Sequence, residues 1–357
     1  QTTPHDMLAH RTSPTNIGLY LLSAACAQRF GWIDAAELAT RLEATLASVD
    51  RLETHNGHLL NWYDTLTGTA LLPRYVSTVD SGNLSGHLLA VAQACTALAG
   101  EPQTAADAQR LQALALRCTR LAWRPDFRFL YHPRRHLLHI GYRVAEQALD
   151  ASYYDLLASE SRLTSLLAIA KGDLPVRHWA ALGRPFFAAG AVAGLRSWSG
   201  SMFEYLMPSL VLDEPPGSVL NDAGLAAVRE QRAFAARQRL PWGVSESAYA
   251  GCDHTLAYQY APQGVPALAL RRTPPDELVV APNASMLAAL VAPGPACANL
   301  VLLQGLGARG TLGFIEALDY TPAWQTEGSD HTLVSTFMAH HQGMGIVALA
   351  NVLLDGV

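Results

Sequence analysis

The sequence predicts an all-α protein in which pairs of helices close into a toroid. Of its 357 residues, 50% are hydrophobic and 15% are charged, so the chain can bury a large core. Apolar residues recur every three or four positions in about eleven segments joined by short loops, which is the spacing of amphipathic helices. These segments share no common residue signature, which argues against a stacked α-solenoid. We therefore expect one domain over residues 1–357, with short β ribbons in its loops.

The clearest helix is expected over residues 34–53. Leu38, Leu42 and Leu46 lie on one face of it, and Asp34 and Glu37 have the spacing of an N-terminal capping box. The same periodicity predicts the other helices, in chain order Ile17–Phe30, Ser85–Leu98, Leu111–Leu121, Leu156–Ile169, Asn221–Gln238, Ala284–Val291, Ala296–Leu306 and Leu333–Leu354. Short ribbons are expected at Phe129–Tyr131, Leu137–Ile140 and Leu278–Val280.

The charge distribution argues against several classes of partner. The formal net charge is −5, and no run of Lys or Arg is available to bind a nucleic acid or an anionic membrane. No stretch reaches the roughly 18 uninterrupted apolar residues of a membrane span, so we expect no span in this chain and a soluble fragment. The five cysteines are widely spaced and form no CxxC pair, which indicates reduced thiols rather than disulfides or a zinc site.

Six groups of acidic residues stand out because aromatic and small residues surround them in the sequence. They are centred on Asp64, Asp80, Asp155 with Glu160, Glu204, Glu246 and Glu316. Aromatic faces stack on the C–H faces of a sugar, and carboxylates bind its hydroxyls. Two carboxylates that flank a glycosidic bond can act as an acid and as a nucleophile or base. Any one of these acids could instead cap a helix or accept from a buried Arg or Tyr, but six together favour a sugar cleft.

Metal and cofactor chemistry is less well supported. His340 and His341 are adjacent, so on a helix their side chains point about 100° apart. No HExxH motif or third-ligand spacing accompanies them, and we expect the pair to contact substrate or to pack in the core. The glycine pattern over Gly305–Gly310 follows a helix rather than a strand, which indicates a loop and not a dinucleotide site. We expect no cofactor and no metal.

Nine motifs in register resemble the middle, glycoamylase-like domain of bacterial cyclic β-1,2-glucan synthases. They are His10–Tyr20, Asn61–Asp64, Val79–Asn83, Ser152–Asp155, Ile169–Asp173, Met202–Pro208, Pro241–Tyr249, Tyr258–Tyr260 and His340–Met344. The resemblance implies an (α/α)6 barrel of glycoside hydrolase family 189 type, which closes linear β-1,2-glucan into a ring by retaining transglycosylation. It also implies that the domain is excised from a larger, membrane-anchored synthase on the cytoplasmic side of the bacterial inner membrane. There its neighbours would be a glycosyltransferase and a phosphorylase-like domain.

The resemblance further assigns roles to residues. Glu160, in the Ala-Ser-Glu segment, would be the acid/base, and Glu246, in Trp-Gly-Val-Ser-Glu-Ser, the nucleophile. Asp155 and Glu204 lie in equally well matched motifs and could replace one of the pair. The positions expected to line the glucan cleft are Trp62, Tyr63, Asp64, Asp80, Asn83, Asp155, Arg162, Trp198, Glu204, Tyr205, Trp242, Tyr249, Tyr258, Tyr260, Glu316, His340 and Gln342.

Two other functions remain compatible with these residues. An endo-β-1,2-glucanase would use the same carboxylates and transfer the glucan to water. A non-catalytic module would grip a growing glucan and present it to neighbouring domains.

Overall fold

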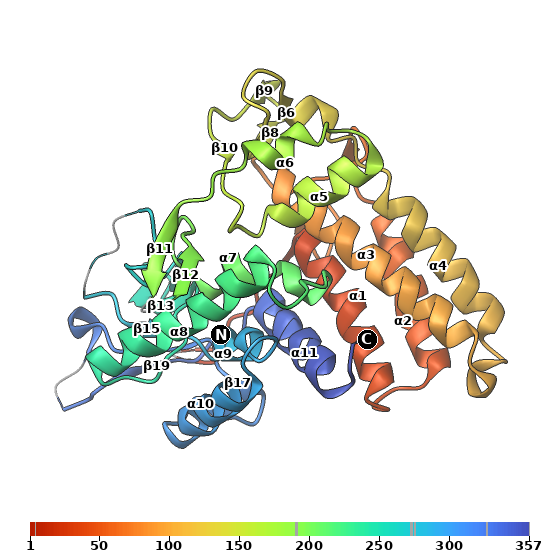
Figure 1. The fold of residues 1–357 in the computed structure, drawn as a ribbon. Coiled ribbons are helices and arrows are strands. Elements are labelled where there is room, and N and C mark those ends of the chain that lie inside the picture. Colours follow the sequence, from red (N-terminus) through yellow and green to blue (C-terminus); the bar gives the residue numbers. More distant parts are fainter. Residues whose placement is uncertain (4, 190–191, 272–273, 275, 326–327, 357) are drawn as a thin grey trace. The chain divides into compact units, whose positions relative to one another are not determined.

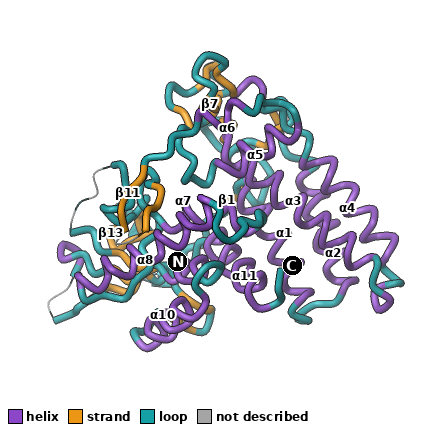
Figure 2. Tube along the Cα trace, in the orientation of Figure 1, coloured by secondary structure: helices purple, strands orange, loops and turns teal. Residues whose placement is uncertain are grey.

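The structure, a computed structural model, describes residues 1–3, 5–189, 192–271, 274, 276–325 and 328–356. It divides into two units, each assembled from separate stretches of chain. The N-terminal unit consists of His10–Asp155, Ser161–Gly183 and Leu354–Val357, and the C-terminal unit of Gln1–Ala9, Leu156–Glu160 and Arg184–Leu353. In both units helices predominate and the strands are short (Figure 2).

The N-terminal unit is built around helix α3. Its helices are α1 (Pro14–Arg29), α2 (Ala35–Val49), α3 (Thr78–Ala99), α4 (Ala108–Ala122), α5 (Arg162–Lys171) and α6 (Arg177–Ala181). Helix α3 packs against α1, α4 and α5 (Figure 1). The approach to α5 requires glycine on α3, because a Cβ at Gly82 would lie 1.9 Å from Thr164 Oγ1. Most of α3 is therefore buried between its neighbours.

Antiparallel ribbons fill the loops of this unit. β1 (Arg11–Thr12) pairs with β4 (Tyr63–Asp64), and β2 (Thr54–His55) with β3 (His58–Leu59). β8 (Gly141–Arg143) lies between β5 (Tyr75–Ser77) and β9 (Ala148–Leu149). β7 (Leu137–His139) lies between β6 (Tyr131–His132) and β10 (Tyr153–Tyr154).

The C-terminal unit packs its helices around α9. They are α7 (Met202–Leu206), α8 (Val219–Gln238), α9 (Pro282–Ala288), α10 (Pro293–Gly305) and α11 (Ala339–Leu353), with α9 in contact with α7, α10 and α11. Its strands are β11 (Phe186–Ala189), β12 (Val192–Leu195), β13 (Ser247–Cys252), β14 (Tyr258–Ala261), β15 (Val279–Val280), β16 (Arg309–Gly310), β17 (Gly313–Phe314), β18 (Ala317–Asp319) and β19 (Thr332–Val334). The pairs β11–β12, β13–β14 and β16–β17 and the order β15–β18–β19 are all antiparallel.

The predicted helices are confirmed, with three shifted starts that bear on function. The helix expected over Ser85–Leu98 begins earlier, at Thr78, and so includes Asp80 and Asn83. The helix expected over Leu156–Ile169 begins only at Arg162, because Leu156 and Leu157 lie in a buried, non-helical segment before it. The helix expected over Leu333–Leu354 begins at Ala339, because Leu333 belongs to β19, which pairs with β18.

The strand predictions need a larger correction. Leu137–Ile140 and Leu278–Val280 do contain strands β7 and β15, but Phe129–Tyr131 lies mostly in a 3-10 turn, Arg128–Leu130, that precedes β6. The sequence analysis missed the hairpins β11–β12 and β13–β14. Small residues such as those of Ser247–Cys252 carry little strand propensity, so pairing with other strands decides their conformation.

Two expectations about the whole chain can be compared with the structure. Among the described residues, no helix combines the length and the apolar character required to cross a membrane. All five cysteines are free, and Cys26, Cys95 and Cys118 are buried. Burial raises the pKa of the Cys26 thiol to about 12, which keeps it protonated and unreactive.

Candidate active site

The C-terminal unit brings Glu246 to a site directly before strand β13. Both backbone polar groups of Val244 pair with the side chain of Gln231 on α8, at 2.6 and 2.7 Å, which fixes the segment without a strand partner. Gly243 allows the bend there, with φ of 119°, a value that L side chains rarely adopt. The Glu246 N–H donates to Ser201 Oγ at 3.2 Å. These bonds tie the segment to α8 and to the start of α7 and leave the Glu246 carboxylate half-buried.

Tyr260, on β14, links Glu246 to a pair of histidines. Its hydroxyl donates to Glu246 Oε1 at 3.0 Å and lies 3.4 Å from His340 Nε2 and 3.3 Å from His341 Nε2. The Tyr260 side chain is 40% exposed, yet its hydroxyl lies among these groups, so the ring offers a face to solvent while the oxygen joins the network. Burial, then the charges of Glu246 and Glu316, raise the pKa of Tyr260 well above its ordinary value, so it stays a donor.

The network ends in a buried carboxylate, Glu316. His341 Nδ1 lies 2.8 Å from Glu316 Oε1, which also accepts from the Ala248 N–H at 3.2 Å. Burial lowers the pKa of His341, but the charge and hydrogen bond of Glu316 and the charge of Glu246 together raise it above its ordinary value. Burial, and then the neighbouring charge of His341, hold the pKa of His340 well below its ordinary value. A cationic His341 therefore lies beside a neutral His340.

The neighbouring charges that raise the pKa of Glu160 are negative, whereas Glu246 also has the positive charge of His341 near it. It lies in the bend just before α5, half-buried, where Ser159 Oγ donates to it at 3.4 Å. Burial, reinforced by the negative charges of Glu204 and Glu246, raises its pKa to about 8. Burial also raises the pKa of Glu246, but the charge of His341 and the hydrogen bond from Tyr260 oppose that rise. The proton therefore resides on Glu160 at neutral pH, and Glu246 is the carboxylate with cationic support.

Glu204 is instead the cap of helix α7. It completes a capping box with Ser201, and its Oε2 accepts from the backbone N–H groups of Ser199, Gly200 and Ser201 at 3.0–3.2 Å. The Ser197 hydroxyl donates to the same oxygen at 2.8 Å. These hydrogen bonds make Glu204 the group that holds the 197–201 loop in place at the start of α7.

We expect Glu204→Gln to lower the free energy of unfolding by about 1.5–3 kcal/mol, because hydrogen bonds to a charged acceptor are lost and an amide N–H₂ faces other donors. Urea denaturation measures the change. The matched control is Glu230→Gln on α8, where Glu230, with 14% of its side chain exposed, accepts from Arg237 at 2.7 Å, and where we expect a change within about 1 kcal/mol. Equal stability of the two variants would contradict the capping role.

The other predicted residues of the C-terminal unit have mixed positions. Trp198 is 46% exposed on the 197–201 loop, where its ring face can meet a ligand. Tyr249 packs on Trp324 with ring centroids 6.0 Å apart, and half-buried Tyr258 directs its hydroxyl to the Leu333 carbonyl at 3.5 Å. Tyr249 and Tyr258 lie in strands β13 and β14, and Trp198 lies in the loop that Glu204 holds.

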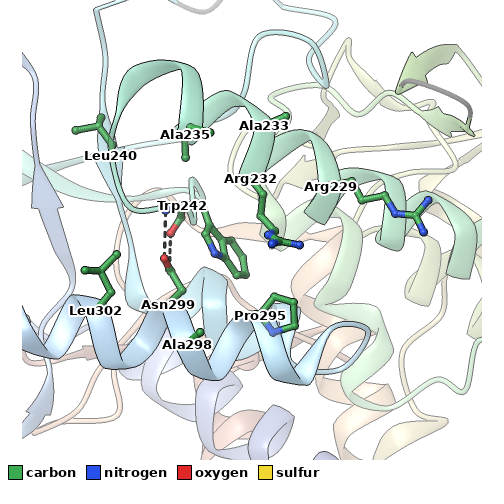
Figure 3. A pocket seen from close by; sticks show the side chains of 11 residues that line it. Arg229, Arg232, Ala233, Ala235, Leu240, Trp242, Pro295, Ala298, Asn299 and Leu302 are labelled. Atoms are coloured by element: carbon green, nitrogen blue, oxygen red, sulfur yellow. Dashed lines mark hydrogen bonds between the residues drawn. The ribbon is translucent and has the colours of Figure 1, made fainter.

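Three predicted residues of this unit are hydrogen-bonded to backbone groups or packed between helices. Tyr205 is 2% exposed and donates to the Leu195 carbonyl at 2.8 Å. Gln342 donates to the Phe314 carbonyl at 3.1 Å. Trp242 lies in a groove between α8 and α10, where Asn299 binds both of its backbone polar groups (Figure 3). Its ring packs between the helices and not against the carboxylates of the Tyr260 network.

In the N-terminal unit, Asp80 and Asn83 belong to one network on α3. Thr15 Oγ1 donates to Asp80 Oδ1 at 2.6 Å and accepts from Asn83 Nδ2 at 3.2 Å. Burial raises the pKa of Asp80, against the hydrogen bonds that lower it. The Trp62 ring lies 5.1 Å from the Arg11 guanidinium, at cation–π distance.

The remaining predicted residues of this unit are Tyr63, Asp64, Asp155 and Arg162. Tyr63 is fully buried, with its hydroxyl bonded to the Glu53 carbonyl at 2.5 Å, which corrects the expectation that its ring lines a cleft. Asp64 Oδ1 caps a turn through the N–H groups of residues 66 and 67. Asp155 directly follows β10, and Arg162, 1% exposed, opens α5.

Sequence reasoning missed His341 as a site residue. It expected the two histidines to diverge by about 100°, but their ring centroids lie 4.1 Å apart and both Nε2 atoms approach the Tyr260 hydroxyl. Both residues lie in the first turn of α11, where His341 is hydrogen-bonded to Glu316. The adjacent pair of histidines in the sequence was the signal that could have identified His341 as a site residue.

Residues 152–357 match the model of the Glycoamylase family, described as "putative glucoamylase". The chain belongs to the glycoamylase family. Over its whole length this glycoamylase-family chain is 39% identical to the cyclic β-(1,2)-glucan synthase NdvB of Rhizobium meliloti, of which it spans 17%. It thus corresponds to about a sixth of that relative's length.

Solved structures share the fold of this glycoamylase-family chain. The endo-β-1,2-glucanase of Talaromyces funiculosus, in complex with sophorose, aligns with a TM-score of 0.77 at 14% identity, over 97% of this chain and 75% of that one. The endo-β-1,2-glucanase of Chitinophaga pinensis aligns with a TM-score of 0.73 at 16% identity, over 96% and 82%. At these identities the likeness is one of fold.

Proposed function

We propose that this chain is a retaining transglycosylase that acts on β-1,2-glucan and closes linear chains into rings. The observation that carries the proposal is the difference between Glu160 and Glu246, of which the first holds a proton at neutral pH and the second has a cationic neighbour, His341. The 39% identity to a cyclic β-(1,2)-glucan synthase supports the choice of substrate.

The first chemical step breaks a β-1,2 bond. Glu246 attacks the anomeric carbon and forms a glycosyl ester, while Glu160 gives its proton to the departing glycosidic oxygen. Tyr260 orients Glu246 by donating to its Oε1, and His341 supports the negative charge of this region before attack. The departing segment leaves as a glucan with a free 2-hydroxyl.

The second step forms a new bond. A 2-hydroxyl at the far end of the same glucan attacks the anomeric carbon of the glycosyl ester, Glu160 accepts the hydroxyl proton, and the bond from that carbon to Glu246 breaks to release a carboxylate. Two inversions at one carbon give net retention. If water takes the place of that hydroxyl, the same groups act as an endo-β-1,2-glucanase.

The proposal extends to architecture and context. We propose that residues 1–357 form one (α/α)6 domain, which the shared fold with endo-β-1,2-glucanases supports. Because the chain spans 17% of its relative, we propose that it works within a larger membrane-anchored synthase at the cytoplasmic face, beside glycosyltransferase and phosphorylase-like domains. The exposed Trp198 and Tyr260 rings of the C-terminal unit are proposed glucan contacts.

The experiment is to incubate the protein with long linear β-1,2-glucan and to analyse the products by mass spectrometry. We expect rings, which are one water lighter than linear chains of the same length. Short linear products alone would assign the hydrolase instead, and unchanged glucan, bound without reaction, would leave only a binding module. A linear β-1,3-glucan serves as the control polymer and should remain unchanged.

A further inference from the structure

We propose that Glu246, His340 and His341 form a binding site for a divalent transition metal of the zinc class. One ligand atom from each of the three residues lies within 4.8 Å of the other two. Two imidazoles and one carboxylate make a ligand set that zinc uses in proteins, with a fourth position left for water or another oxygen. Imidazole nitrogen disfavours Mg²⁺ and Ca²⁺, which take oxygen ligands.

The position of the Tyr260 hydroxyl supports this geometry. Zinc bonds of about 2.0–2.1 Å in a tetrahedron place neighbouring ligand atoms about 3.4 Å apart. The Tyr260 oxygen lies 3.0 Å from Glu246 Oε1, 3.4 Å from His340 Nε2 and 3.3 Å from His341 Nε2. It therefore lies at similar distances from all three ligand atoms, beside the position that a bound ion would take.

Glu316 supplies the outer support that metal-binding histidines commonly have. It is 2% exposed and lies 2.8 Å from His341 Nδ1, so Nε2 of the same ring is the nitrogen left for a metal ion, which would displace the proton that cationic His341 carries there. The Ala248 N–H in turn holds Glu316 at 3.2 Å. Carboxylates in this position orient the ring and increase its basicity as a ligand. Together Glu246 and Glu316 bring two negative charges to a divalent cation.

Two of the three proposed metal ligands are partly exposed to solvent. Glu246 and His340 are half-buried, whereas only His341 and Glu316 are enclosed. The two half-buried side chains can therefore move toward an ion that His341 already faces. A bound metal would occupy the Glu246 oxygen that attacks the sugar, so it would inhibit glucan transfer; this consequence rests on the proposed function, whereas the site itself does not.

The test uses Co²⁺ alone as a spectroscopic stand-in for Zn²⁺, added to the whole chain after treatment with a chelator. We expect one equivalent to produce visible absorption of a four-coordinate nitrogen and oxygen site, without the near-ultraviolet charge-transfer band of thiolate ligands. We expect His340→Ala, which removes a ligand, to weaken this binding by more than the roughly 10–100-fold that loss of an outer-shell partner costs, and Zn²⁺ to displace Co²⁺. Glu246→Gln provides a second variant that keeps His340 in place and should weaken binding as well.

Exposed His254 provides the matched control, because His254→Ala removes an imidazole outside the cluster and should leave Co²⁺ binding unchanged. Absence of visible absorption with the wild type, a thiolate band from the exposed Cys252 or Cys297, or equal binding by His340→Ala would overturn the proposal. Glucan turnover is measured separately in chelator. A lack of products there would count against the proposed function and not against the metal site.

Discussion

Replacing Glu246 with Gln is expected to lower the rate of glycosyl transfer by a factor on the order of 10⁴ to 10⁶, as loss of a nucleophile does in other covalent mechanisms. The amide keeps the size of the side chain and can still accept from Tyr260, but it does not attack the anomeric carbon. The measurement is the rate at which rings and new reducing ends appear from long linear β-1,2-glucan.

Azide distinguishes a lost nucleophile from lost binding. With Glu246→Ala, which removes the carboxylate and leaves space beside the anomeric carbon, the small anion can attack directly from that side, which gives a glucosyl azide of inverted, α configuration. The control Glu230→Gln removes a carboxylate from α8, where it accepts from Arg237, and should transfer glucan at the wild-type rate. A Glu246→Gln variant as active as this control would refute the assignment of the nucleophile.

Glu160→Gln is expected to reduce the rate by a factor on the order of 10² to 10⁴, the usual contribution of a positioned general acid. Azide here traps the glycosyl ester that Glu246 still forms, so the product has retained, β configuration. The opposite configurations from the two variants assign the roles separately. If Glu160→Gln yielded the α azide, the two roles would be exchanged.

The dependence of the transfer rate on pH also tests the proton on Glu160. Glu160 must be protonated in the first step, so the wild-type rate should fall as pH rises through about 8. Glu246 must be ionised, so the rate should also fall at low pH, below a pKa that burial raises above its ordinary value. Initial rates across pH should therefore be bell-shaped, and Glu160→Gln should lose the alkaline limb.

Glu160 also ties stability to pH. Its folded-state pKa of about 8 exceeds the ordinary 4.5, so between these values the folded state binds more protons than the unfolded state. The free energy of unfolding therefore decreases as pH rises through this window. Because Gln carries no charge, Glu160→Gln should be more stable than the wild type at pH 9, by on the order of 2 kcal/mol. Denaturation curves at pH 5 and pH 9 would show this difference growing with pH.

The helices could be predicted from apolar periodicity because most of them bury one face. α2 shows this best, since Leu38, Leu42 and Leu46 are fully buried and Asp34 caps it through the Glu37 N–H at 2.8 Å. Periodicity failed where buried residues lie in bends, as at Leu156, because burial alone does not require a helix. It also could not place Glu160 in the bend before α5, where its solvation and hence its pKa are set.

The site was predictable in its residue types but not in their division of labour. Glu160, Glu204 and Glu246 all lie beside small and aromatic residues in the sequence, yet Glu204 accepts from hydroxyl and backbone donors of its own loop while Glu160 is near two like charges. These differences depend on how the 197–201 loop folds around Glu204 and on which charges lie near Glu160 in space. Likewise Tyr205 and Tyr260 belong to similar motifs, but only Tyr260 reaches solvent.

The configuration of the first bond formed at the anomeric carbon tests double displacement by Glu160 and Glu246 most directly. Proton NMR at early times, with long linear β-1,2-glucan as substrate, resolves the anomeric signals of new linkages and of newly released reducing ends before mutarotation. Double displacement predicts β linkages in every new bond and β anomers first wherever water is the acceptor. Newly formed α anomers at the earliest times would contradict attack by Glu246 and require water to attack the sugar in a single step.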